Sequence, residues 1–153
     1  MVMSAPLYLD HNATTPVDPV VMDAMLPFMT AQFANPSATY ASGRLSRRAI
    51  DRAREQVAAA IDADPSEVVF TASGSEANNL LIQGLARAYR AETGALVHLA
   101  CAATEHPCVL APMRALQQEG YGFSTLPVSA QGVISKAAMT ALPAQTTLTS
   151  VMM

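Results

Sequence analysis

The chain has 153 residues, of which 51% are hydrophobic and 14% are charged, a balance that excludes a disordered protein and suits one compact α/β domain. Its net charge of −3 offers no general attraction to nucleic acid or to an anionic membrane. We expect no transmembrane helix and no secretory signal, because no apolar run has the required length or flanks. Two cysteines are too few for a disulfide framework, so the composition predicts a cytoplasmic protein.

The N-terminal part predicts a short strand and a helix between polar loops. A strand is expected at 7–9, followed by the polar turn 10–15. Asp18-Pro19 then opens a helix that extends to about residue 28. Small polar residues at 35–40 predict a second loop before the next helix.

A longer helix is predicted at 44–61 by apolar residues four apart: Leu45, Ala49, Ala53, Val57 and Ile61. Five of the eight arginines lie on this helix, and no aromatic residues alternate with them. We therefore expect the arginines to form a solvated or subunit-contact face, and we expect no direct binding of nucleic acid.

Beyond residue 67 strands and helices alternate. The β-branched run Val68-Val69-Phe70 predicts a short buried strand. Further strands are expected at 96–100, 123–127 and 147–152, with helices at 76–91, from 107 and from about 135. This alternation favours a mainly parallel sheet flanked by helices.

Small, flexible residues separate the 68–70 strand from its helix. A helix that starts there directs the N–H groups of Gly74, Ser75 and Glu76 outward at the positive end of its dipole, with the Ser75 hydroxyl as a further donor. Ser73 and Glu76 also match a capping box, which closes the helix without any ligand. The local sequence leaves an anion site and a plain cap open. It contains neither of the glycine-rich nucleotide-binding motifs.

A histidine marks the next junction between a strand and a helix. His106 precedes Pro107, a favourable first helical residue, so its imidazole is expected at the junction and not on a helix face. The alternative is a histidine that only caps the helix. His11 and His98 are expected to be ordinary residues, and the spacing of cysteines and histidines predicts no metal site.

The last predicted strand, 147–152, has no cap, polar tail or returning helix after it. Ligands of open parallel sheets bind beyond the carboxyl ends of the strands. We therefore expect the sequence to be truncated, with part of the chemistry in residues that would follow Met153.

Four segments, taken in order and spacing, resemble the cysteine desulfurases over residues 8–153. They are Tyr8-Leu9-Asp10-His11-Asn12-Ala13-Thr14-Thr15-Pro16, Phe33-Ala34-Asn35-Pro36-Ser37, Ser73-Gly74-Ser75-Glu76-Ala77-Asn78-Asn79 and Thr104-Glu105-His106-Pro107. Tyr40 is a departure, because the family usually has a histidine after its Asn-Pro-Ser segment. The resemblance implies a pyridoxal 5′-phosphate (PLP) dependent transferase of fold type I, within the class V aminotransferases. It further implies a segment near the active site at 1–15 and, at 16–153, an incomplete large domain whose C-terminal half is absent.

The same resemblance implies roles for particular residues. Gly74 and Ser75 would hold the cofactor phosphate, in agreement with the helix start described above. His106 would stack on the pyridine ring and help to move protons, work that suits imidazole near neutral pH. Asn12, Ala13 and Thr14 would approach the substrate side. The alternative for these three is a turn satisfied by its own side chains.

The implied reaction converts L-cysteine to L-alanine and leaves a persulfide on the enzyme, for iron–sulfur cluster assembly or thiolation of tRNA. A homodimer and a sulfur-acceptor or scaffold protein are the implied partners. The family's cofactor-binding lysine lies in a Ser-x-His-Lys motif that is missing here, and Lys136 is expected to face solvent. Cys101 and Cys108 are expected to be small core residues, not the family's nucleophile. We therefore expect the chain alone to be inactive.

Two alternatives remain open from the sequence. One is a catalytically dead remnant that serves only as an association module. The other is a different class V enzyme, such as a selenocysteine lyase or an aminotransferase.

Overall fold

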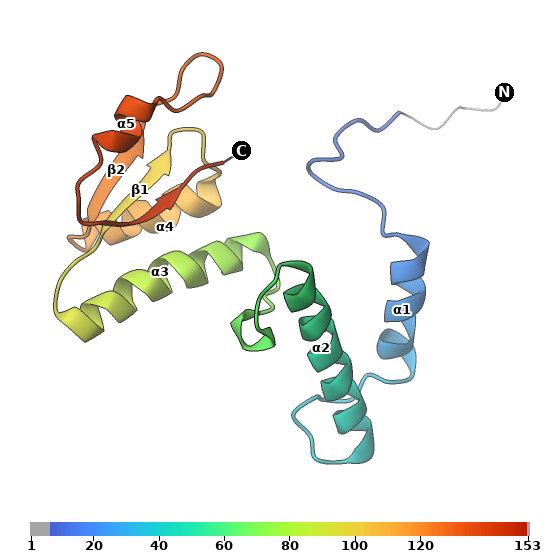
Figure 1. Ribbon diagram of the computed structural model, residues 1–153. Coiled ribbons are helices and arrows are strands. Elements are labelled where there is room, and N and C mark those ends of the chain that lie inside the picture. The colour runs from blue at the N-terminus through green and yellow to red at the C-terminus, as the bar shows by residue number, and fades with distance from the viewer. Residues whose placement is uncertain (1–6, 153) are drawn as a thin grey trace. The chain divides into compact units, whose positions relative to one another are not determined.

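The computed structural model describes residues 7–152 (Figure 1). Where the composition suggested one domain, the chain divides into two units, Met1–Val69 and Phe70–Met153. The boundary predicted at residue 15 stays a prediction.

The first unit contains the helices α1 (Pro19–Thr30) and α2 (Ala41–Ala60) and the short 3₁₀ helix η1 (Pro65–Glu67). Asp18 caps α1 as predicted, because its carboxylate accepts a hydrogen bond from the Val20 N–H at 2.8 Å. The strand predicted at 7–9 is wrong. No strand of the described residues pairs with this segment, and its side chains are exposed.

The buried face of α2 differs from the predicted apolar stripe, whose members Leu45, Val57 and Ile61 are exposed. The buried residues are the small ones, Gly43, Ser46 and Ala58.

Small residues are buried at the start of α2 because the preceding loop lies close to the helix there. A Cβ atom on Gly43 would lie 2.8 Å from the Asn35 carbonyl oxygen, and the Ser46 hydroxyl donates to the Gln32 carbonyl at 3.1 Å.

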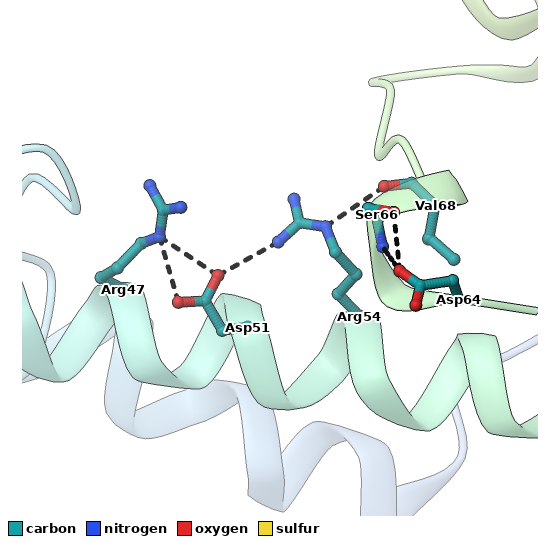
Figure 2. Close-up of polar contacts among 6 residues, drawn as sticks. All are labelled: Arg47, Asp51, Arg54, Asp64, Ser66 and Val68. Atoms are coloured by element: carbon teal, nitrogen blue, oxygen red, sulfur yellow. Dashed lines mark hydrogen bonds and ion pairs between the residues drawn. The ribbon is translucent and has the colours of Figure 1, made fainter.

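On the charged surface of α2, one carboxylate forms ion pairs with two arginines (Figure 2). Asp51 accepts from the Arg47 Nε atom and from the Arg54 Nη1 atom, each at 3.1 Å. The Arg54 Nε atom also donates to the Val68 carbonyl at 3.2 Å. Because these groups are at least partly solvated, we assign them an ordering role with little net stabilisation.

The second unit contains α3 (Gly74–Thr93), β1 (His98–Ala102), α4 (Pro107–Gln118), β2 (Gly122–Leu126), α5 (Lys136–Thr140) and β3 (Thr146–Ser150). The strands form a parallel sheet in the order β2-β1-β3. The predicted parallel sheet flanked by helices is confirmed, with strand ends shifted by one or two residues.

The strand predicted at Val68-Val69-Phe70 is wrong. No strand of the described sheet includes it, and Val69 and Phe70 are 66% and 48% exposed. A β-branched run favours an extended backbone, but it does not by itself make the segment part of a sheet.

The pairing of β3 with β1 contains an irregularity. His98 pairs with Thr146 and Leu99 pairs with Leu148, so Thr147 is an extra residue in β3. Beyond the bulge, Cys101 lies opposite Ser150.

The core of the second unit lies where the sheet meets α3 and α4, which run alongside each other in Figure 1. Alternate residues of β1, Leu99 and Cys101, enter this core. It also contains Ile82, Ala86, Val97, Val109, Met113, Leu116 and Tyr121. This packing fixes the ends of α3 and α4 relative to the carboxyl end of β1.

Candidate functional site

The first turn of α3 is closed by its own side chains. The Ser73 hydroxyl accepts from the Glu76 N–H at 3.1 Å, so the predicted cap at Ser73 is confirmed. The Glu76 carboxylate accepts from the Ala72 N–H at 2.8 Å. The expectation that the Glu76 N–H points freely outward is therefore wrong, because Ser73 already binds it.

Two donors of this turn remain available. Among the residues that the structure describes, the N–H groups of Gly74 and Ser75 have no acceptor, and both residues are exposed. A Cβ atom on Gly74 would meet nothing within 4 Å, so the backbone is open to a ligand. Two free N–H groups at the positive end of a 20-residue helix suit an anion. The cap and the anion site are compatible, because they use different N–H groups.

His106 is the N-cap residue of α4, with its imidazole exposed. The Nδ1 atom accepts a hydrogen bond from the Cys108 N–H at 3.1 Å. A nitrogen that accepts has no proton of its own, so the proton of the neutral ring is on Nε2. The cap thus fixes the tautomer and leaves Nε2–H as the free polar group of the ring.

The first turns of α3 and α4 lie side by side. The Asn78 amide donates to the Cys108 sulfur at 3.0 Å, and Figure 1 shows both helices starting at the same end of the unit. This end is also where β1 leads into α4, the usual ligand side of a parallel sheet. The structure therefore brings Gly74, Ser75 and His106 to one end of the second unit.

The segment Asn12-Ala13-Thr14 lies in the first unit, within a turn that its own residues satisfy. The Ala13 N–H donates to the Asp10 carbonyl at 3.1 Å. The Tyr8 hydroxyl donates to the same carbonyl at 2.9 Å and lies 2.6 Å from the Thr14 hydroxyl. These bonds are those of the plain turn, and the substrate-side role stays a prediction.

The thiols and the lysine lie as predicted. Cys101 is fully buried in the core, and Cys108 is half-buried against it. Burial raises the pKa of the Cys101 thiol, as does the Glu105 carboxylate, while Arg114 lowers it. Lys136 is exposed at the start of α5. Within residues 7–152, no three His, Cys, Asp or Glu side chains gather as a metal site.

Glu105 and Ser150 are not among the predicted site residues. Glu105 is only 8% exposed, and its Oε1 atom accepts from the Ser150 hydroxyl at 2.8 Å. The sequence contains one signal for Glu105, which is its position shortly after a strand predicted to be buried. A charged side chain is rarely buried without a partner, so a partner for Glu105 could have been expected.

Comparison with known proteins gives the family. The sequence model described as Aminotransferase class-V matches residues 7–153, and the chain belongs to this family. Its homologues include cysteine desulfurases. It is 47% identical over 149 residues to cysteine desulfurase of Rattus norvegicus, covering 96% of this chain and 32% of the relative. It is 42% identical over 152 residues to cysteine desulfurase IscS of Rickettsia akari, covering 98% and 36%.

A solved structure of SspA in complex with cysteine has the same fold. The TM-score is 0.83 at 38% identity, and the match covers 94% of this chain and 41% of that one. The predicted PLP-dependent transferase fold type I, as part of a large domain, is confirmed. The chain spans about a third of the length of the curated relatives it matches. Among the described residues, no helix is both long and apolar enough to cross a membrane.

Proposed function

We propose that this chain is the phosphate-binding part of a PLP-dependent cysteine desulfurase. The enzyme would convert L-cysteine to L-alanine and pass sulfur, as a persulfide, to a sulfur-acceptor or scaffold protein for iron–sulfur cluster assembly or tRNA thiolation. The homologues named above support this reaction, as does the similar structure of SspA, which is a complex with cysteine. A homodimer and a cytoplasmic location belong to the same proposal.

The observation that supports it best is the pair of free donors at the start of α3. The family is PLP-dependent, and the N–H groups of Gly74 and Ser75 fit a phosphate in number and in dipole sign. When bound, PLP supplies an electron sink that stabilises negative charge on the substrate carbon. The open space at Gly74 lets the phosphate approach the backbone closely.

His106 contributes a ring of defined orientation. Its Nδ1 atom is engaged by the Cys108 N–H, so only Nε2 is available to donate or accept a proton without breaking the cap of α4. A proton that the ring gives or takes at the site is therefore carried by one atom, Nε2.

Lys136, Cys101 and Cys108 do not complete the chemistry. Lys136 is the single lysine of the 153 residues and lies exposed on α5. Cys101 is buried with its thiol kept protonated, and Cys108 packs against the core. We propose that the cofactor-binding lysine and the sulfur-accepting cysteine are not among these residues, so this chain by itself binds PLP without turnover.

A matched pair of variants at Gly74 tests the phosphate site. Proline is tolerated at the first position of a helix and removes the N–H donor, and the extended backbone of Ser73 (φ −161°, ψ 160°) accepts a following proline. Gly74→Ala keeps the donor and adds a methyl group in open space. A hydrogen bond to a charged group contributes about 1.5–3 kcal/mol, so Gly74→Pro should weaken PLP binding about 10-fold to 100-fold.

The measurement is a titration of the full chain with PLP, followed by the change in cofactor absorbance, with inorganic phosphate as competitor. Gly74→Ala should bind PLP nearly as the unchanged chain does. Equal affinity of Gly74→Pro and Gly74→Ala would show that the N–H does not hold the phosphate. An equal large loss in both would mean that free space, not the donor, is what the ligand requires.

A further inference from the structure

The turn between β1 and α4 is bonded to the strands on both sides of β1. The Ala103 N–H donates to the Leu126 carbonyl of β2 at 3.0 Å. The Ser150 hydroxyl of β3 donates to the Glu105 carboxylate at 2.8 Å. The Glu105 N–H closes the turn on the Ala102 carbonyl at 3.2 Å. Of these three bonds, only that between Glu105 and Ser150 joins two side chains, so a substitution can remove it without altering the backbone.

The Glu105 carboxylate is held in a defined place. It is nearly buried, and a buried carboxylate is costly unless it is hydrogen-bonded. Ser150 lies opposite Cys101 in the register of β1 and β3, and Cys101 faces the core that α4 completes. The carboxylate is therefore on the side of the sheet where α4 begins.

His106 follows Glu105 directly and is fixed from the other direction by α4. Its carbonyl accepts from the N–H groups of Val109 and Leu110 at 2.9 and 3.2 Å, and its ring accepts from Cys108. The junction is thus held to the helix on one side and to the sheet on the other.

We propose that Glu105 is a positioning residue for His106, an inference that rests on the proposed function. Its bond to Ser150 holds the turn so that the imidazole keeps the Nδ1 contact with the Cys108 N–H and presents Nε2–H to the site. Without the carboxylate, the turn is tied to β2 alone, and the ring leaves its single tautomer.

The test reads the ring nitrogens of His106 by NMR in the full chain labelled with ¹⁵N-histidine, without cofactor. A His106→Asn variant assigns the signals. Glu105→Ala and Ser150→Ala should replace the single Nε2–H tautomer of His106 with a mixture. Glu105→Gln should restore the single tautomer, because its amide oxygen still accepts from Ser150.

Ser124→Ala is the matched control. It also removes one hydroxyl from a strand that flanks β1, but this hydroxyl lies 2.8 Å from the Nε2 atom of His98. It should alter the His98 signals and leave those of His106 unchanged.

An unchanged His106 tautomer in folded Glu105→Ala would overturn the proposal, even if the variant melts at a lower temperature. If Glu105→Ala does not fold, Ser150→Ala removes the same bond, and an unchanged tautomer in that variant would overturn the proposal equally.

A parallel PLP titration separates this proposal from the proposed function. A tautomer that responds as expected in a chain that binds no PLP would keep the positioning role and refute the cofactor site. PLP binding with an unresponsive tautomer would do the reverse.

Discussion

Gly122 has no room for a side chain, because the His98 ring occupies the space beside it. A Cβ atom added at Gly122 would lie 2.9 Å from the Cγ atom of His98 and 3.2 Å from its Cβ atom. The imidazole cannot move away freely, since its Nε2 atom is bonded to the Ser124 hydroxyl at 2.8 Å. We therefore predict that Gly122→Ala is destabilising, and that His98 is the reason.

The magnitude follows from two opposing effects. Overpacking costs about 1–3 kcal/mol, and displacing the ring also endangers a hydrogen bond of about 1 kcal/mol. Replacing glycine by alanine returns about 0.4–1 kcal/mol by restricting the unfolded chain. The expected net loss in the free energy of unfolding is about 2 kcal/mol, or roughly 4–8 °C in melting temperature for a chain of this size.

A double-mutant cycle measures the effect by denaturant unfolding of the full chain. In a His98→Ala background the obstructing ring is gone, so Gly122→Ala should become neutral or slightly stabilising. Gly74→Ala is the control, because a Cβ atom there meets nothing within 4 Å. Equal costs of Gly122→Ala in both backgrounds would refute the assignment to His98.

Two predictions concern pH. Burial and the Glu105 carboxylate raise the pKa of Cys101 above its ordinary value of 9.0, so the folded state retains a proton that the unfolded state loses. The unfolding free energy should therefore fall above about pH 9, and less so in Cys101→Ala; parallel stability curves for the two proteins would contradict this. The Ser66 hydroxyl and N–H lower the pKa of Asp64 below its ordinary value of 3.8, so the stability that they give is present above that pH and is lost as the pH falls through the folded-state value. Melting temperatures between pH 3 and 6 should drop more steeply for the unchanged chain than for Asp64→Asn, and identical slopes would count against the role of Asp64.

The helix starts that have a side-chain cap were predicted best, because the signal of a cap is local, whereas the uncapped start of α2 lies three residues before the predicted one. Asp18-Pro19 and His106-Pro107 each place a side-chain acceptor before a proline, and the structure has both caps. Ser73 also caps its helix as predicted, with Gly74 instead of a proline after it. The phosphate site at Gly74 and Ser75 stays a prediction.

The errors arose where structure depends on distant partners. The strand predicted at 68–70 had the right residue types but no pairing strand in the described chain. The buried face of α2 was chosen by a loop that approaches Gly43 and Ser46, and helical periodicity contains no information about that loop. For the same reason the bond between Glu105 and Ser150, which are 45 residues apart, could not be predicted.

The extra residue in β3, Thr147, shifts by one position which later residues of β3 lie opposite the residues of β1. Without a bulge at Thr147, each later residue would move by one position, and Thr149 instead of Ser150 would lie opposite Cys101. The shift keeps Leu148 level with Leu99 and, two residues later, brings a hydroxyl to the Glu105 carboxylate. Because of this one inserted residue, β3 can pack Leu148 beside Leu99 and also place the Ser150 hydroxyl where it binds Glu105, in the turn before His106.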